Sequence, residues 1–308
     1  MKQAVLLLNM GGPSNIEEVE LFLKNMFADP NILPMNSLLR KLVASIIVKK
    51  RLHEAQENYK LIGGKSPLLE ITEELAAKIE QNSGTPCYPV MRYVPPFATK
   101  VLEDLKAGGI EELVLLPMYP HHSSTTTKSS VDDIIDSCKK INYAVKIRVI
   151  EEYYNNSDFV SIQSELIKDA LGGNNPADIK LIVSAHGLPL SIIEAGDPYQ
   201  EQIESNYKLL IEKLREEGIN FKACELAYQS KVGNGTWLEP NLSDVLRNPS
   251  HLDVLIFPIA FTVDNSETIF ELDIEHREIA QKIGYNSYRV AKCPNSSDKF
   301  AEFLTQIL

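Results

Sequence analysis

One histidine, His186, occupies a position at which α/β proteins often place reactive side chains. It follows the apolar run 181–183, which predicts a buried strand, and it precedes Gly187 and Pro189, which interrupt regular structure. Parallel α/β sheets bind ligands at the carboxyl ends of their strands. An imidazole changes protonation near neutral pH and binds first-row metals. The position therefore predicts proton transfer or metal binding by His186, with a buried turn residue as the structural alternative.

A line of carboxylates follows a second buried strand, at residues 254–258. Its members are Asp264, Glu267, Glu271 and Glu275. Spacings of three and four place side chains on one face of a helix, where like charges repel one another. The helix macrodipole stabilises only the first of these carboxylates. We interpret the line as a track for cations, with a solvated acidic face as the alternative. Together with His186 it suits Fe²⁺ or another first-row divalent metal.

The elements that must hold these side chains alternate between strands and helices along the chain. Strands are expected at 4–8, 90–94, 112–117, 145–150, 180–183, 222–228 and 254–258, and helices at 68–81, 98–107, 159–171, 200–217 and 267–283. This alternation predicts an α/β fold with parallel sheets flanked by helices. We expect two domains, 1–153 and 154–308, with the active site in the cleft between them. The last helix is assigned to the second domain, with packing back on the first as the alternative.

Composition narrows the class of protein. The chain has 308 residues, 44% hydrophobic and 24% charged, and a net charge of −11, which disfavours nucleic acid as a partner. Its cysteines are too far apart in sequence for a zinc or iron–sulfur ligand pair, and each is expected to be a small buried residue. They are Cys87, Cys138, Cys224 and Cys293. The apolar N-terminal run is too short for a signal peptide, so we expect a cytoplasmic protein.

Two further segments leave alternatives open. Residues 35–51 are apolar, helical in pattern and flanked by basic residues, but they are too short to span a bilayer. They form either a helix that packs in the core or an apolar lip that covers a ligand or rests on the inner face of a membrane. The hydroxyl-rich segment 121–130 either caps a helix or binds an anion.

Taken in order, the motifs of this chain resemble those of the ferrochelatases, which insert ferrous iron into a porphyrin at the end of haem synthesis. The motifs are LNMGGP at 8–13, GGKSP at 63–67, MRY at 91–93, LPMYP at 116–120, SAHGLP at 184–189, YQSKVG at 228–233 with Trp237, and ETIFELDIE at 267–275. The resemblance implies the chelatase fold, in which two flavodoxin-like halves bind the porphyrin between them.

The resemblance also implies roles for individual residues. His186 and Glu267 match the pair associated with metal delivery and proton removal, and Glu271 and Glu275 match the acidic track that carries metal toward them. Met10 matches the position that faces the macrocycle. Relatives that act on coproporphyrin tend to have tyrosine there, so Met10 favours protoporphyrin IX and the product protohaem.

Further positions matching porphyrin contacts are Tyr59, Ser66, Arg92, Tyr93 and Trp237. Either Arg92 or Lys65 is expected to pair with the propionates. We expect no permanently bound cofactor, because iron is a substrate, and no iron–sulfur cluster, because the cysteine-bearing extension of some relatives is absent. The family usually has a histidine where this chain has Asn265, which places more of the proton transfer on His186.

Three alternatives share these features. A coproporphyrin chelatase and a cobalt chelatase acting on an earlier tetrapyrrole would have the same fold. A carrier that binds haem or metal without catalysis would also use His186 and the carboxylates.

Overall fold

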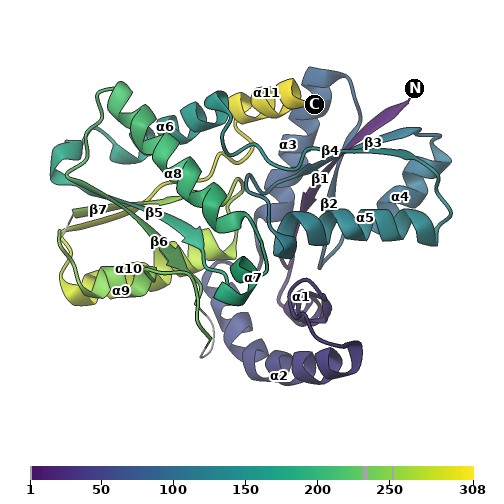
Figure 1. Ribbon diagram of the computed structural model, residues 1–308, viewed down its shortest axis with the longest axis horizontal. Coiled ribbons are helices and arrows are strands. Elements are labelled where there is room, and N and C mark those ends of the chain that lie inside the picture. Colours follow the sequence, from purple (N-terminus) through teal and green to yellow (C-terminus); the bar gives the residue numbers. More distant parts are fainter. Residues whose placement is uncertain (1, 232–234, 252) are drawn as a thin grey trace. The chain divides into compact units, whose positions relative to one another are not determined.

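The computed structural model describes residues 2–231, 235–251 and 253–308 (Figure 1). The chain forms two compact units. The first contains Met1–Glu152 and Ser296–Leu308, and the second contains Tyr153–Asn295.

The end of the chain belongs to the first unit, which is the alternative given for the last helix and not its assignment to the second domain. Helix α11 (Asp298–Ile307) packs against α3 (Leu68–Ser83) in the first unit. Its buried face includes Phe300 and Phe303. The Nζ atom of Lys78 donates to the carbonyl of Ser296, 2.6 Å away. Apolar burial of one helix face therefore attaches these residues to the first unit.

The first unit is built on a parallel sheet in the order β2-β1-β3-β4. Its strands are β1 (Gln3–Asn9), β2 (Cys87–Met91), β3 (Glu112–Pro117) and β4 (Lys146–Val149). The residues of β1 are apolar on both faces because both faces are buried, as in other parallel sheets. Leu6 and Leu8 face α4 (Ala98–Ala107) and α5 (Ser129–Lys140).

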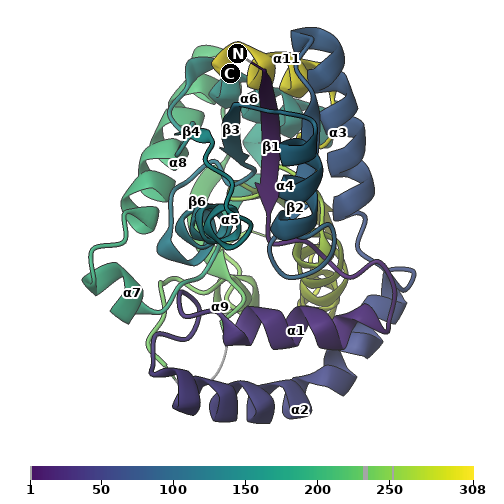
Figure 2. The ribbon, with the colours of Figure 1, turned by 90° about the vertical axis from the view of Figure 1, so that its right-hand side faces the viewer.

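Two helices of the first unit form a separate pair beside the sheet. α1 (Glu18–Ala28) and α2 (Ser37–Leu61) lie along each other (Figure 2). Their shared core includes Leu23, Ala44 and Val48. The segment expected as a core helix or a lip therefore belongs to a 25-residue helix with one packed face. No helix within the described ranges is both long and apolar enough to cross a membrane.

The second unit repeats the design with the strand order β6-β5-β7-β8. Its strands are β5 (Lys180–His186), β6 (Ala223–Gln229), β7 (Asp253–Pro258) and β8 (Ser287–Val290). Alternate residues of β5 face opposite layers, as the pleat requires. Leu181 and Val183 pack with α6 (Ser157–Leu171) and α8 (Tyr199–Glu216).

The other face of this sheet is covered by the segments that follow β6 and β7. Ile182 packs there with α9 (Leu242–Arg247), the π-helix η3 (Glu267–Glu275) and α10 (His276–Ile283). Two short helices complete the unit, namely η2 (Pro176–Asp178) and α7 (Leu190–Glu194).

Several expected boundaries move in the structure. β2 begins three residues before the expected strand 90–94, because its pairing with β1 runs from Val5–Cys87 to Asn9–Met91. The helix expected at 267–283 is divided into η3 and α10, and β8 was not expected. The segment 121–130 contains the π-helix η1 (Ser124–Lys128), and Ser123 Oγ accepts a hydrogen bond from the Thr125 N–H, 3.2 Å away. This hydroxyl therefore caps a helix.

The cysteines follow their expected environment in three of four cases. Cys87, Cys138 and Cys293 are buried, whereas Cys224 is half-buried.

Candidate active site

His186 is the last residue of β5 rather than the first residue after it. It pairs in register with Gln229 at the end of β6. The Tyr199 hydroxyl donates to the His186 carbonyl at 3.0 Å, and the Gly187 N–H donates to the Gln229 carbonyl at 2.8 Å. A Cβ atom on Gly187 would lie 2.8 Å from that same carbonyl oxygen. Only glycine therefore allows this close turn directly after the histidine.

The His186 imidazole contacts the carboxylate of Glu267. Nδ1 of His186 lies 2.7 Å from Oε2 of Glu267. An ionised carboxylate only accepts hydrogen bonds, so Nδ1 carries the proton. In the neutral ring Nε2 then holds the lone pair. This pairing confirms that β5 and the start of η3 place the two predicted residues together, and it makes Nε2 the atom that can accept a proton.

Two further groups converge on Glu267, and a third holds one of them in place. Gln229 Nε2 and Ser230 Oγ each lie 3.2 Å from its Oε2 atom. Gln229 is held in turn by Ser184, whose hydroxyl donates to Gln229 Oε1 at 2.8 Å. Burial alone would raise the pKa of Glu267, but the charge and hydrogen bond of His186, with the Ser230 and Gln229 hydrogen bonds, outweigh burial and lower it. The site therefore favours the carboxylate form of Glu267.

The same environment acts on His186. Burial alone would lower the pKa of His186, but the charge and hydrogen bond of Glu267, together with the charge of Glu271, raise it. An imidazole with a raised pKa takes up a proton more readily than an isolated one. The pair is thus suited to receive protons from a bound molecule.

Glu271 lies one step further along η3. The Ser230 N–H donates to Glu271 Oε1 at 2.7 Å, and Ser230 Oγ donates to Oε2. Burial and the negative charge of Glu267 raise the pKa of Glu271 to about 7. Two neighbouring carboxyls thus have pKa values shifted in opposite directions, a pattern that is frequent at functional sites.

The track continues to Glu275, which is exposed. Potential ligand atoms of Glu271, Glu275 and His276 all lie within 4.8 Å of one another. His276 Nδ1 lies 2.6 Å from the Glu271 carbonyl and therefore donates to it, while Nε2 lies 3.1 Å from Ser243 Oγ. Both nitrogens of the buried His276 ring are thus hydrogen-bonded, so its observed contacts hold η3 in place.

A π-helix carries this line, although the sequence predicts an ordinary α-helix. π-helical turns are rare and frequently occur at functional sites. Asp264 precedes η3 and does not join the line, which corrects its predicted place. Its carboxylate accepts from Asn295 Nδ2 at 2.7 Å and from Thr268 Oγ1 at 3.0 Å, because both donors lie beside it.

Asn265 has a local role at the start of the same helix. Its Oδ1 atom accepts from the Glu267 N–H at 2.8 Å, and its Nδ2 atom donates to the Val263 carbonyl at 3.0 Å. An amide in this position satisfies a backbone donor at a helix start but takes up no proton near neutral pH. The residue thus orients the backbone that carries Glu267.

In the first unit, the motifs at 8–13 and 63–67 are joined at Ser66. The Ser66 N–H donates to the Pro13 carbonyl at 2.8 Å. A Cβ atom on Gly12 would lie 2.5 Å from both Cβ and Oγ of Ser66, so glycine is needed for this close approach. Met10 is half-buried directly after β1. The motifs at 8–13 and 63–67 thus form one structural element.

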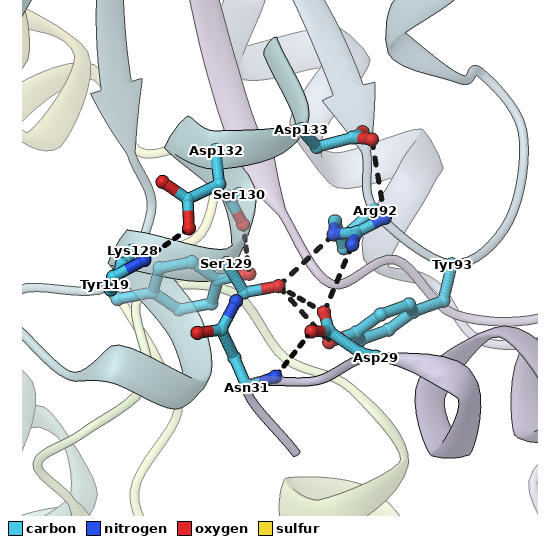
Figure 3. A network of polar contacts seen from close by, with 10 residues as sticks. All are labelled: Asp29, Asn31, Arg92, Tyr93, Tyr119, Lys128, Ser129, Ser130, Asp132 and Asp133. Carbon is cyan, nitrogen blue, oxygen red and sulfur yellow. Dashed lines mark hydrogen bonds and ion pairs between the residues drawn. The ribbon is translucent and has the colours of Figure 1, made fainter. Parts of the chain in front are cut away.

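Arg92 belongs to a polar network (Figure 3). Its guanidinium lies 3.1 Å from Asp29 Oδ2, 3.1 Å from Ser129 Oγ and 3.3 Å from Asp133 Oδ1. Tyr93, whose side chain is fully buried, donates from its hydroxyl to Asp29 Oδ2 at 3.0 Å. Arg92 is therefore partly neutralised by two carboxylates, and Tyr93 helps to fix this network from a buried position. Because its side chain is fully buried, the predicted direct contact of Tyr93 with a porphyrin is wrong for this structure.

The other residues predicted to contact the porphyrin or its propionates are Tyr59, Lys65 and Trp237, and each has different neighbours. Tyr59 is buried in the core shared by α1 and α2. Lys65 pairs with Glu70 on the surface. Trp237 is half-buried and forms an isolated bridge with Pro189. In the motif at 228–233, Val232 and Gly233 lie outside the described residues.

Four residues of these two clusters were missed in the sequence analysis. They are Asp29, Ser129, Gln229 and Ser230. For Gln229 and Ser230 a signal existed, since they end the strand beside β5 and belong to the YQSKVG motif. No comparable signal marks Asp29, whose carboxylate meets Arg92 only through folding.

Solved structures define the class of protein. The chain resembles SirB from Bacillus subtilis, with a TM-score of 0.59, 12% identity, and coverage of 99% of this chain and 94% of that one. It also resembles CbiX, described as the terminal enzyme for biosynthesis of siroheme in denitrifying bacteria, with a TM-score of 0.54, 13% identity and full coverage of both chains. With its two parallel sheets, the protein has the chelatase fold.

The chain belongs to the ferrochelatase family. The sequence model of that family matches residues 2–308. A ferrochelatase of Wolinella succinogenes is 46% identical over 310 residues, which cover 100% of this chain and 98% of the relative. One from Helicobacter pylori is 42% identical over 310 residues, covering 100% and 92%. The protein is thus an enzyme of the ferro-lyase type.

Proposed function

We propose that this protein inserts ferrous iron into protoporphyrin IX to give protohaem, with His186 and Glu267 as its catalytic pair. The observation that carries the proposal is the 2.7 Å contact between His186 Nδ1 and Glu267 Oε2 at the carboxyl end of β5. This contact leaves a proton-accepting nitrogen of His186 beside a carboxylate. The chain also belongs to a family of iron chelatases, which supports the same reaction.

The chemistry requires removal of two pyrrole protons and of water from the ion. His186 Nε2 accepts the first pyrrole proton, releases it to solvent, and then accepts the second, since its side chain is 37% exposed. The adjacent Glu267 carboxylate stabilises the imidazolium that forms each time. Oxygen and nitrogen donors of this kind bind divalent first-row metals. Glu271 and Glu275 supply carboxylates along one line toward that pair. Iron is the substrate here, and it reaches the macrocycle from the side of these carboxylates.

Residues of the first unit are proposed to recognise the porphyrin. Met10 is the side chain that faces the macrocycle, and its lack of a hydroxyl favours protoporphyrin IX over coproporphyrin. Arg92 offers the edge of its guanidinium to a propionate, although Asp29 and Asp133 compete for that charge. Ser66 contributes by holding the loop that follows Met10.

An anaerobic spectroscopic assay tests this function. Ferrous iron is added to the protein with protoporphyrin IX or with coproporphyrin III, and haem formation is followed. Turnover with protoporphyrin IX and much slower turnover with coproporphyrin III is expected. Preference for coproporphyrin III would identify the closest rival, and cobalt insertion into an earlier tetrapyrrole would identify the second. Tight haem binding without metallation would identify a carrier.

A second proposal concerns the exposed side of α2. Leu38, Leu42 and Ile46 follow one another at helical spacing and are 80%, 60% and 49% exposed. Lys49 and Lys50 are exposed on the same helix, although the chain carries a net charge of −11. Exposed apolar residues beside basic ones are typical of helices that rest on anionic membranes. We propose that α2 makes peripheral contact with the inner face of such a membrane.

Vesicle sedimentation tests this contact. The protein is mixed with vesicles of phosphatidylcholine alone or of phosphatidylcholine with phosphatidylglycerol, whose headgroup gives the vesicle a negative surface. Binding to the second kind only, and its loss in Leu38→Asp/Leu42→Asp, is expected. If the double variant leaves vesicle binding unchanged but raises the KM for porphyrin, the exposed residues instead cover the ligand.

A further inference from the structure

Ser230 contacts both carboxylates of the metal track. Its Oγ atom lies 3.2 Å from Glu267 Oε2 and also donates to Glu271 Oε2. Its backbone N–H donates to Glu271 Oε1 at 2.7 Å. These contacts connect this one residue to Glu267 and to Glu271 at once. As a result, one oxygen of each carboxylate is held close to a single point, the Ser230 hydroxyl.

The backbone of Ser230 adopts a conformation that serves this contact. Its φ angle is 66°, in the left-handed region that residues other than glycine seldom adopt. Such strain persists where surrounding contacts require it, and it is frequent at functional sites. Directly after β6, this conformation aims the N–H and the hydroxyl of the same residue at η3.

The chemistry of the hydroxyl limits what it can do. Ser230 Oγ has one hydrogen to donate, so it serves one carboxylate at a time while two acceptors lie beside it. A divalent cation, in contrast, binds oxygens of both carboxylates together. The hydroxyl therefore keeps the two carboxylates convergent until an ion takes its place between them.

We propose that Ser230 is a positioning residue for iron, which holds the Glu267 and Glu271 carboxylates together so that the ion passes from one to the other. The proposal rests on the proposed function and deepens it, because it names the residue that links the outer carboxylates to the catalytic pair. Ser230 itself donates no electron pair in the reaction and removes no proton from the porphyrin.

Two substitutions separate the hydroxyl from the backbone. Ser230→Gly removes the hydroxyl, keeps the N–H and relieves the left-handed strain, whereas Ser230→Ala removes the hydroxyl and keeps the strain. The two variants should therefore differ in thermal stability but agree in iron handling. Asn142→Gly is the matched control, because Asn142 has a φ angle of 51° and lies after α5, in the other unit.

The test measures iron handling in two ways. With the whole protein, both Ser230 variants should raise the KM for ferrous iron by about tenfold, which is the usual effect of losing a residue that orients a metal ligand. The KM for protoporphyrin IX should stay within about twofold of the original value. Calorimetric titration of the protein alone with Zn²⁺ should show an affinity lower by a similar factor. Asn142→Gly should match the original protein in both.

The outcomes distinguish this inference from the proposed function. Unchanged iron KM and Zn²⁺ affinity in both Ser230 variants would overturn the role of Ser230, as would equal rises in the KM for iron and for porphyrin. If Ser230 had a purely structural role, the rise in the KM for iron and the fall in Zn²⁺ affinity would both follow thermal stability. These two effects would then differ between Ser230→Gly and Ser230→Ala. Failure of the original protein to metallate protoporphyrin would refute the function alone, because the Zn²⁺ titration does not depend on turnover.

Discussion

His186 and Glu267 are 81 residues apart in the chain, yet Nδ1 of the imidazole lies 2.7 Å from Oε2 of the carboxylate. The contact determines the tautomer of the ring, because a carboxylate accepts the Nδ1 proton and leaves the lone pair on Nε2. Gln229 and Ser230 hold the carboxylate from the other side. The geometry therefore provides a proton acceptor whose orientation is set by Glu267 and by the groups that hold it.

Removing the imidazole should abolish most of the activity. For His186→Ala we expect a loss of about 10²–10⁴-fold in kcat, the range typical of a general base. Porphyrin binding, followed by fluorescence, should change little. The exposed His53 on α2 supplies the control, because His53→Ala should retain full turnover. Substantial iron insertion by His186→Ala would remove His186 from the mechanism.

Neutralising Glu267 should lower the rate and also shift its pH dependence. Glu267→Gln should cost about 10–100-fold in kcat, as for other residues that orient a metal-binding or catalytic histidine. Because Glu267 raises the pKa of His186, its loss should move the rising limb of the kcat/KM profile to lower pH. A profile that keeps its position would contradict the pairing. Glu278→Gln, at an exposed ion pair, is the control.

Stability should respond to pH through Glu271. Its pKa of about 7 lies above the ordinary value of 4.5, so the folded protein retains a proton that the unfolded chain releases between these values. Folding stability from this group therefore falls as the pH rises from about 4.5 to 7. Glu271→Gln should match the original protein near pH 4 and be more stable by about 3 kcal/mol at pH 8, the free energy that separates pKa values of 4.5 and about 7.

Urea unfolding at the two pH values measures this difference. Glu278→Gln, whose side chain is exposed, should show no such dependence on pH. Equal stability of Glu271→Gln and the original protein at pH 8 would show that ionisation of Glu271 does not lower the free energy of unfolding.

The network around Arg92 should matter for stability. Asp29 is 2% exposed and accepts hydrogen bonds from Tyr93, Ser129 and the guanidinium of Arg92. Asp29→Asn leaves that guanidinium with one carboxylate fewer, so we expect a loss of about 3 kcal/mol in the free energy of unfolding. In contrast, Asp132→Asn breaks only an exposed pair with Lys128 and should cost about 0.5 kcal/mol or less. Similar losses for the two variants would argue against a buried network.

The close approach of two loops gives a further test. Gly12→Ala places a Cβ atom 2.5 Å from Ser66, and we expect a loss of about 1–3 kcal/mol from the resulting overpacking. Gly108→Ala is matched to it, since the nearest atoms there lie at an ordinary 3.5 Å. Thermal unfolding of the two variants measures the difference. An unchanged melting temperature for Gly12→Ala would mean that the loop at Ser66 moves easily to make room for the added methyl group.

Local patterns in the sequence account for much of the fold. The apolar runs at 4–8 and 112–117 predicted the central strands because both faces of a parallel sheet are buried. The short strand β8 was missed, since four residues with two polar side chains give little periodic signal. The π-helix was missed because a spacing of four residues is also compatible with an α-helix.

The candidate site was predictable only where its chemistry was visible in one segment. His186 and the carboxylates stood out by residue type and spacing, and the structure confirms the contact between His186 and Glu267. The contacts of Ser230 with the carboxylates depend on a left-handed backbone angle, and those of Asp29 depend on the packing of three elements around it. Neither property can be read from residue type, because each depends on partners distant in sequence.

The π-helix also fixes the angle, measured around the helix axis, between two sets of side chains. Glu267 and Glu271 point to Ser230, while Leu272 and Ala280 pack on the sheet. Each residue of a helix turns the direction of its side chain by a fixed angle, which is about 100° in an α-helix such as α10. Deleting a single residue from this stretch would therefore rotate one set relative to the other. The contacts with Ser230 and the packing on the sheet therefore both depend on the number of residues in this segment. Insertions and deletions here should be tolerated far less than substitutions.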